Sequence, residues 1–286
     1  LSIGLDISHF DNDHYGKVRW LRVNNGIFKG HEWYRNTGTK DDYGGFIRAS
    51  YQLTGKLNLF GDVQYRHIYY KMKGPDDDLL LLDQNHKFDF FNPKAGASYR
   101  FNSKNEVYAS FATVGREPTR SDFKDASKEG GRELPKDERL FDYELGYHYT
   151  GSNARFSLNF YYMDYKDQIL STGKINDVGY PIMENVTDSY RTGVELSGGF
   201  NITKQLKFDA NIAFSYSKIK DYINHLDMYD NATDWAPLPQ KEEHLGTVDI
   251  GFSPRWVSAA LLSYAPTDNL SFGLIGKYVS KQYYDN

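Results

Sequence analysis

The feature that most constrains the fold of this chain is a strict alternation of side chains on both sides of a tight turn near residue 103. A period of two places successive side chains on opposite faces of a β-strand. Two such runs joined by a short polar turn must be antiparallel neighbours. The hairpin has one continuous apolar face, which another sheet or lipid must cover. The residues on that face are Pro93, Ala95, Ala97, Tyr99 and Phe101 before the turn, and Val107, Ala109, Phe111 and Thr113 after it.

The same hairpin pattern repeats along the chain and predicts an all-β fold of about eleven strands. Tight turns are expected near residues 54, 103, 151, 203 and 267. Long connections, rich in glycine, proline and charge, are expected at 24–42, 74–87, 117–138, 171–188 and 223–252. Short turns at one edge and long loops at the other are typical of an outer-membrane barrel with periplasmic turns and extracellular loops. The sequence therefore predicts that residues 1–286 are part of one antiparallel, up-and-down transmembrane β-barrel domain.

Composition agrees with membrane-crossing strands rather than with a membrane-crossing helix. Mean hydropathy is −0.67, and no apolar run reaches the roughly 18 residues that a spanning helix needs. The alternating runs reach or exceed the roughly 9–11 residues of a membrane-crossing strand. Aromatic residues make up 16% of the sequence, and many of them cluster near the tight turns, as in the aromatic girdle of a membrane interface. A soluble β-sandwich with an aromatic core is the alternative from another class.

Charge and cysteine content argue against several other functions. A net charge of −4 argues against a nucleic-acid-binding surface, and the absence of cysteine removes disulfides, thiolate metal ligands and thiol nucleophiles. The sequence contains no glycine-rich phosphate loop and no nucleophile elbow. We therefore expect no enzyme, no cofactor and no metal site. Asp76, Asp77 and Asp78 could order a loop around calcium, but a solvated loop is the favoured interpretation.

The strand count suggests that the chain is a piece of a longer protein. An up-and-down barrel closes only with an even number of strands, and the expected number, about eleven, is odd. In lipid, each unpaired backbone group at an open strand edge costs several kcal/mol. We therefore expect the edge strands, Leu1–Phe10 and Asn269–Tyr284, to pair with the remaining strands of the same barrel or with a second copy of the chain.

Several short motifs, in a fixed order, resemble the later barrel strands of TonB-dependent outer-membrane receptors. The motifs are Asn92–Lys94, Tyr108–Ser110 with Arg116–Pro118, Glu144–Tyr147, Tyr162–Asp167 and Gly193–Leu196. Their order is more specific than any single motif, and the resemblance covers nearly the whole chain from about residue 40. In that family a barrel of about 22 strands surrounds an N-terminal plug. This sequence departs from the pattern because it shows no plug, no N-terminal segment for TonB contact and no terminal strand with a final aromatic residue.

The resemblance implies a function, a location and a set of partners. As a barrel segment, the chain would help to import a scarce nutrient, with a ferric siderophore or other iron chelate expected, across the outer membrane of a Gram-negative bacterium. The implied partners are outer-membrane lipid, the chelate, and a TonB complex reached through the missing N-terminal part. The chain alone is not expected to transport anything. A receptor for a glycan or a vitamin, and a non-transporting barrel such as an adhesin or an outer-membrane enzyme, remain alternatives.

Candidate ligand-binding residues come from the expected long connections and the strand ends beside them. Aromatic rings and guanidinium groups together suit a planar, anionic ligand, through stacking and charge pairing. Packing of loop against loop is the alternative interpretation at each position. The candidates are Trp33, Tyr34, Arg35, Arg116, Arg120, Tyr180 and Trp235.

Overall fold

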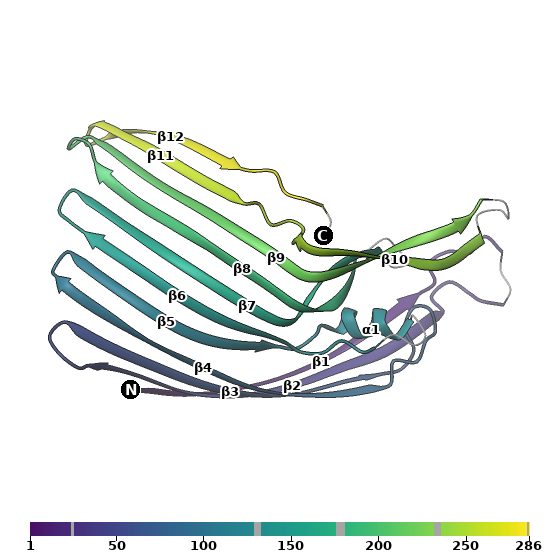
Figure 1. Ribbon diagram of the computed structural model, residues 1–286. Coiled ribbons are helices and arrows are strands. Elements are labelled where there is room, and N and C mark those ends of the chain that lie inside the picture. The colour runs from purple at the N-terminus through teal and green to yellow at the C-terminus, as the bar shows by residue number, and fades with distance from the viewer. Residues whose placement is uncertain (24–25, 129–132, 176–180, 232–235, 285) are drawn as a thin grey trace. The chain divides into compact units, whose positions relative to one another are not determined.

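A computed structural model describes the chain except at residues 24–25, 129–132, 176–180, 232–235 and 285 (Figure 1). Its described part contains one sheet of twelve strands and one helix, which confirms the all-β, antiparallel, up-and-down class. The strands neighbour one another in chain order from β1 to β9 and continue with β11 and β12, while β10 pairs with β9 only. The elements are β1 (Ser2–Lys17), β2 (Glu32–Gln52), β3 (Leu57–Lys73), β4 (Gln84–Asn102), β5 (Asn105–Arg116), α1 (Arg120–Lys128), β6 (Glu138–Thr150), β7 (Ala154–Ile175), β8 (Pro181–Asn201), β9 (Leu206–Asp230), β10 (Ala236–Asp249), β11 (Trp256–Thr267) and β12 (Leu270–Val279).

The residues of the chain group into two compact units. The first unit contains Leu1–Ala49, Asp62–Pro93 and Gly115–Asp137, and the second contains Ser50–Gly61, Lys94–Val114 and Glu138–Asn286. In the second unit, tight turns of two to four residues connect β2 to β3, β4 to β5, β6 to β7, β8 to β9 and β11 to β12 (Figure 1). Backbone hydrogen bonds of 2.8 Å join these turn regions in series, for example from Thr150 N to Lys104 O and from Asn201 N to Asn153 O. The tight turns therefore share one edge of the sheet.

Local side-chain chemistry explains where three of these turns form. The hydroxyl of Thr54 accepts hydrogen bonds from the backbone N–H groups of Lys56 and Leu57, at 3.2 and 3.0 Å. Asn102 Oδ1 accepts from two backbone N–H groups in the same way, and so does the hydroxyl of Thr203. Threonine and asparagine stabilise turns because a short polar side chain can replace a backbone acceptor.

One face of the second unit carries continuous apolar rows, and we call it the apolar face. Directly paired residues in adjacent strands have side chains on the same face of a sheet. Leu145 and Trp256 are 55% and 46% exposed although both are large and apolar, so this face suits an apolar environment. The register builds one row from Leu145, Phe160, Val194, Phe214 and Trp256, and a neighbouring row from Tyr147, Leu158, Leu196 and Ile212.

The opposite face of the second unit, which we call the polar face, carries hydrogen-bonding and charged side chains. One row consists of His148, Ser157, Ser197 and Asn211, in which the hydroxyls of Ser157 and Ser197 are 2.8 Å apart. A cavity of about 350 Å³ is lined by polar residues that include Glu144, Tyr161, Arg191, Glu195 and Ser215. The two faces of one sheet therefore suit two different environments.

The connections between strands differ from the expected long loops because the strands extend further than their apolar parts. β2 begins at Glu32, so much of the expected loop 24–42 is strand. The expected loop 171–188 is strand up to Ile175 and again from Pro181, and the segment 74–87 is a connection only up to residue 83. Beyond the apolar rows a strand needs no alternation of hydrophobicity, so sequence periodicity does not mark where it ends.

Two further elements lie inside segments that were expected to be loops. The segment 223–252 contains the end of β9 and the whole of β10, which pair from Asp249 and Lys218 outwards to Ala236 and Asp230. β11 pairs with β9 only as far as Phe214, and β10 pairs with the same edge of β9 from Lys218 onwards. The segment 117–138 contains α1. In the described part of the chain, no helix is long and apolar enough to cross a membrane.

Candidate functional site

Helix α1 packs against one face of β3 and β4 in the first unit, and the aromatic ring of Phe123 is the centre of this contact. Phe123 is 1% exposed and packs with the buried Met72 and Leu82. The ring of His86 stacks on it with centroids 3.8 Å apart and planes 15° apart. The Ser127 side chain, one turn later, accepts a 2.6 Å hydrogen bond from the Gln84 amide. We call this arrangement of α1, the connection 74–83 and the adjoining strand residues the α1 corner.

The start of α1 is fixed by a side-chain cap. The Asp122 carboxylate accepts hydrogen bonds from the backbone N–H and the hydroxyl of Thr119, at 2.7 and 2.8 Å. The backbone N–H of Asp122 in turn donates to the Thr119 hydroxyl at 3.4 Å. Such reciprocal contacts between the residue before a helix and one in its first turn satisfy backbone groups that would otherwise lack partners. Pro118, Thr119 and Asp122 are the sequence signal that could have indicated this helix.

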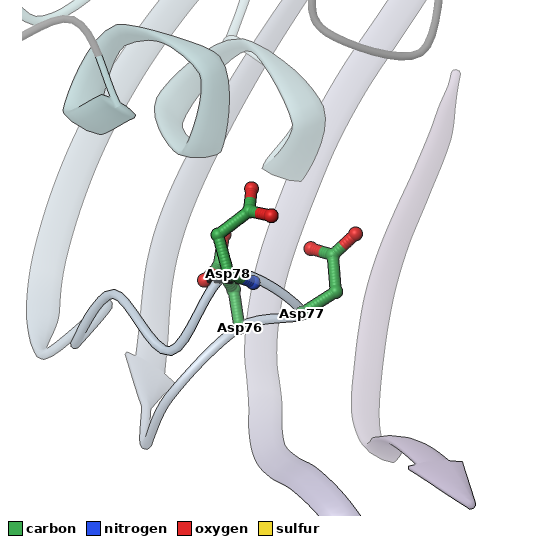
Figure 2. Close-up of side chains that lie close together, drawn as sticks. All are labelled: Asp76, Asp77 and Asp78. Carbon is green, nitrogen blue, oxygen red and sulfur yellow. Dashed lines mark hydrogen bonds between the residues drawn. The ribbon is translucent and has the colours of Figure 1, made fainter. Parts of the chain in front are cut away.

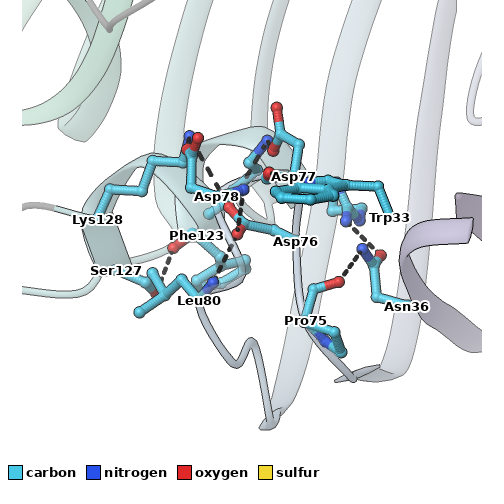
Figure 3. Close-up of polar contacts among 12 residues, drawn as sticks. Trp33, Asn36, Pro75, Asp76, Asp77, Asp78, Leu80, Phe123, Ser127 and Lys128 are labelled. Carbon is cyan, nitrogen blue, oxygen red and sulfur yellow. Dashed lines mark hydrogen bonds and ion pairs between the residues drawn. The ribbon is translucent and has the colours of Figure 1, made fainter. Parts of the chain in front are cut away.

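Three consecutive aspartates of the connection 74–83 face α1 (Figure 2). Asp76 is 1% exposed, and its Oδ1 atom accepts hydrogen bonds from the backbone N–H groups of Asp78 and Leu80, at 3.0 and 2.9 Å. Its Oδ2 atom has no hydrogen-bond partner but lies 3.8 Å from both Lys124 Nζ and Lys128 Nζ. The same two lysines form ion pairs with Asp77 and Asp78 respectively (Figure 3).

Ion pairs between the three aspartates and the two lysines therefore hold α1 against the connection 74–83. We call Asp76, Asp77, Asp78, Lys124 and Lys128 the ion-paired latch. One oxygen from each carboxylate lies within 4.8 Å of the others, close enough for a shared cation. The two lysine ammonium groups already balance most of the negative charge, so a divalent cation would have to displace them. Burial raises the pKa of Asp77, but the hydrogen bond and charge of Lys124 and the charge of Lys128 together outweigh burial. The pKa of Asp77 is therefore lower than its usual value.

Two residues of β2 connect this corner to the rest of the first unit. The indole N–H of Trp33 donates to the Asp77 carbonyl at 3.1 Å. Asn36 is 2% exposed; its amide donates to the Pro75 carbonyl at 2.9 Å, and its oxygen accepts from the Arg120 guanidinium at 2.6 Å (Figure 3). Asn36 thus joins β2, the connection 74–83 and α1. Sequence reasoning missed it, because nothing in its local pattern distinguishes a buried bridging asparagine from an exposed one.

Arg120 and the partly buried side chains on which its charge acts, His14 and Tyr70, form what we call the basic group around Arg120. Arg120 Nε is buried and has no hydrogen-bond partner. Burial lowers the pKa of His14, and the charges of Arg120 and Lys124 lower it further, while Asp13 opposes them. Burial raises the pKa of the Tyr70 hydroxyl, which the charge of Arg120 opposes. The charge of Arg120 therefore acts on both an imidazole and a phenol, and a guanidinium, an imidazole and a phenol can each donate hydrogen bonds to an anion.

A second charged network connects the start of the connection 117–137 to β2 and β3. Glu117 Oε1 lies 2.5 Å from Lys40 Nζ and 3.7 Å from the Arg66 guanidinium, and Arg66 also pairs with Asp42. The other carboxylate oxygen of Glu117 is buried without a hydrogen-bond partner. Arg116, the last residue of β5, immediately precedes this network in the chain.

The structure places Trp33, Tyr34 and Arg35, which were expected to lie together in one loop, in strand β2. The pairing with β1 is irregular there, because Gly16 pairs with Tyr34 and Lys17 with Glu32, so Trp33 lies at a β-bulge. Arg35 pairs with Glu32 and Asp13, and its guanidinium lies 4.7 Å from the centroid of the Tyr15 ring. Of the candidate residues, the α1 corner brings together Trp33 and Arg120. Tyr180 and Trp235 lie outside the described residues.

Comparison with known proteins identifies the family. The family model for the TonB dependent receptor-like beta-barrel matches residues 2–286, and the chain belongs to this family. Its members are outer-membrane proteins of Gram-negative bacteria. No curated protein matches the sequence.

Several solved structures share the fold at low sequence identity. The copper transporter OprC is 16% identical with a TM-score of 0.71, and the alignment covers 99% of this chain and 41% of OprC. The ferric yersiniabactin uptake receptor FyuA from Yersinia pestis is 16% identical with a TM-score of 0.66, over 99% of this chain and 40% of FyuA. The ferric-catecholate import receptor Fiu from E. coli K12 is 16% identical with a TM-score of 0.64, over 97% and 42%. The chain thus spans less than half the length of these proteins, and its fold is that of a partial receptor barrel.

Proposed function

We propose that this chain forms part of the barrel wall of an outer-membrane receptor that imports a scarce nutrient, with a ferric siderophore or other iron chelate as the ligand. The observation that carries the proposal is the two-faced sheet of the second unit, in a chain that belongs to a receptor family. The exposed apolar rows suit lipid, and the polar face suits a water-filled or protein-filled interior. Import is an activity of the complete receptor, energised through its contact with TonB, and not of these residues alone.

The basic group around Arg120 supports an anionic ligand. The Nε–H of Arg120 is unpartnered but buried, so a ligand oxygen can accept from it only if the side chains that cover it move. Tyr70 and the neutral His14 add further donors, and aromatic rings beside a guanidinium favour planar chelates. We propose Arg120 as the principal contact, with Trp33, Tyr34, Arg35, Arg116, Tyr180 and Trp235 as the remaining candidates from the same sequence reasoning.

The partners follow from the same proposal. Outer-membrane lipid covers the apolar face, and the nutrient enters on the side of the long connections. β1 and β12 stand at the two ends of the strand order, and we propose that further strands of the same barrel, or a second copy, pair with them. Such pairing satisfies backbone groups that lipid cannot.

Uptake by cells tests the proposed function. Iron-starved cells that express the complete receptor are supplied with a panel of labelled ferric chelates and a copper salt, beside cells that lack it. We expect receptor-dependent accumulation of at least one ferric chelate, and a reduction of about tenfold or more in its apparent affinity for Arg120→Gln, because a charge-assisted hydrogen bond is lost. Arg100→Gln, which removes an exposed arginine paired with Glu106, is the matched control. Uptake of copper alone, or of no member of the panel, would contradict an iron-chelate receptor.

A further inference from the structure

Two histidine side chains of the first unit lie beside α1, one near its start and one at its centre. His86 of β4 stacks on the buried ring of Phe123, with centroids 3.8 Å apart and planes 15° apart. His14 of β1 is directly paired with Asn36 of β2, so the two side chains share one face of the sheet. Asn36 accepts the hydrogen bond from Arg120 of α1. The docked position of α1 therefore determines the surroundings of both imidazoles.

His86 is connected to α1 by hydrogen bonds as well as by stacking. Its Nε2 atom lies 2.9 Å from Gln84 Oε1, and the amide nitrogen of Gln84 donates to the Ser127 hydroxyl of α1 at 2.6 Å. The ring of Phe88 lies nearly parallel to the imidazole, with centroids 6.4 Å apart. His86 lies outside the apolar part of β4, which begins at Pro93. Burial in this aromatic group is the cause that lowers the pKa of the imidazole.

The carboxylates of the α1 corner have partners other than this imidazole. Those of the ion-paired latch pair with Lys124 and Lys128, Asp122 caps the start of α1, and Asp83 accepts from a backbone N–H at 2.8 Å. From β3, Tyr70 lies against Phe123, and burial raises the pKa of its hydroxyl, so it stays neutral in acid. A protonated His86 would therefore have to compete with existing contacts for a balancing charge.

His14 faces cations that belong to the helix itself. Burial lowers the pKa of His14, and the charges of Arg120 and Lys124 lower it further, against the opposing charge of Asp13. His14 lies outside the apolar part of β1, which ends at Ile7. Because Arg120 and Lys124 move with α1, their repulsion of a protonated His14 decreases when the helix leaves the sheet.

Both imidazoles act on α1 in the same direction as the pH changes. Each pKa is lower in the docked state than the usual value of 6.5, so each group takes up a proton when α1 is released. Their stabilisation of the docked helix is present above about pH 6.5 and is lost as the pH falls through the docked pKa. The pKa of Asp77 lies below 3.8, so its ion pair in the latch persists in mild acid. The histidines therefore control the range between about pH 6.5 and 5.

We propose that His14 and His86 form an acid-operated switch, which releases α1 from the sheet when both imidazoles take up a proton. Arg120 moves with the released helix, so its hydrogen bond to Asn36 is broken. The ligand contact proposed for Arg120 is then lost, and mild acid favours release of the ligand. The consequence for the ligand rests on the proposed function, whereas the release of α1 does not.

Hydrogen exchange of the complete receptor without ligand tests the switch. Exchange is followed by mass spectrometry between about pH 7.5 and 5, and each rate is corrected for the intrinsic pH dependence of amide exchange. We expect the protection of α1 to fall by about tenfold or more over this range, while the protection of β9 from Phe208 to Phe214 stays constant. Each imidazole can account for at most about tenfold per pH unit, because it takes up one proton.

Two substitutions identify the groups that titrate. His86→Phe keeps an aromatic ring against Phe123 but cannot take up a proton, so it should remove much of the acid-dependent loss of protection. Addition of His14→Gln should remove the remainder. His67→Gln is the matched control, because His67 is a partly exposed histidine of the same unit that pairs with Asp89 at 2.8 Å; this variant should behave like the wild type.

A third variant has the opposite expected sign and does not depend on removal of a histidine. Gln84→Glu places a carboxylate beside Nε2 of His86, which favours the imidazolium while α1 is docked and should shift the loss of protection to lower pH. Protection of α1 that does not change with pH in the wild type, or an unchanged loss in the double variant, overturns the switch. Either result leaves the proposed function intact, because nutrient uptake is measured separately. Loss of protection in acid without uptake of any ferric chelate overturns the proposed ligand and leaves the switch intact.

Discussion

In the hairpins of β6 to β9, large apolar side chains such as Leu145 and Phe160 stay exposed, whereas in the α1 corner Met72, Leu82 and Phe123 are buried against one another. Apolar and polar side chains alternate regularly along the hairpins, and the stability of the apolar rows depends on what surrounds the sheet. The corner carries its own small core and its own ion pairs, so its stability depends on contacts within the protein. The hairpins are therefore expected to respond to a change of the surrounding lipid or solvent, and the α1 corner to a change of its internal packing.

The largest effect is expected from removal of the aromatic ring at the centre of the corner. Phe123→Ala should destabilise the docked position of α1 by about 3–5 kcal/mol, because large-to-small substitution of a fully buried aromatic residue leaves a cavity. Limited proteolysis of the folded protein measures this directly, since an undocked helix exposes the connection 117–137. Leu134→Ala is the control, because Leu134 belongs to the same connection and is 45% exposed. Equal cleavage rates for the two variants would show that α1 is not held by this core.

The hairpins should respond to charge on one face and tolerate it on the other. Ile212→Arg should cost roughly 2–4 kcal/mol if Ile212 lies near the middle of the membrane, whereas Asn211→Arg on the polar face should cost much less. The free energy of unfolding by denaturant in lipid vesicles gives the comparison. Equal costs at these two adjacent positions would refute the assignment of the two faces.

Asn36 tests whether one buried amide connects the parts of the corner. Asn36→Ala removes the partner of the Pro75 carbonyl and one partner of Arg120, and unsatisfied buried groups typically cost about 1–3 kcal/mol. Hydrogen exchange should become faster in both the connection 74–83 and α1, although these segments are far apart in sequence. Asn85→Ala, at an exposed position of β4, is the control. Faster exchange in only one of the segments would mean that Asn36 does not couple them.

The ion-paired latch should make the smallest contribution. Lys128→Gln removes one of its lysines, and partly exposed ion pairs are worth about 0–1 kcal/mol. The pKa of Asp77 is lowered from 3.8 in the folded protein, so its stabilisation is present above that pH and is lost as the pH falls through the folded value. The pKa of Lys128 is raised from 10.5, so its stabilisation is present below that pH and is lost as the pH rises through the folded value. Cleavage near α1 should therefore be flat between about pH 7 and 9, and should rise slightly at high salt. Below that range the imidazole of His86, whose pKa burial lowers from 6.5, must take up a proton beside Phe123 and adds its own loss of stability. A sharp change between about pH 7 and 9 would contradict this latch.

The sequence predicted the hairpins because their determinants are local. Alternation from Leu206 to Tyr216, and turn residues such as Thr54, Asn102 and Thr203, act within a few positions of one another. The corner was not predicted because Asn36 joins residues 75 and 120, which no local pattern connects. β10 was missed because its prolines and charges, at Pro237 and Lys241 among others, resemble a loop, although prolines are tolerated on an edge strand. Of the ligand candidates, the sequence could propose Arg120 by residue type but not its position beside His14 and Tyr70.

The most direct test of the central claim uses the absence of cysteine from the sequence. Single cysteines are introduced in turn from Lys207 to Phe214 along β9, labelled with a fluorophore, and examined in lipid vesicles that contain the complete receptor. Labels at Phe208, Ala210, Ile212 and Phe214 should be quenched by brominated lipid, and labels at Lys207, Asp209, Asn211 and Ala213 by a water-soluble quencher, in strict alternation. Quenching that does not alternate with a period of two would contradict a membrane wall with one face toward lipid and the other toward the barrel interior.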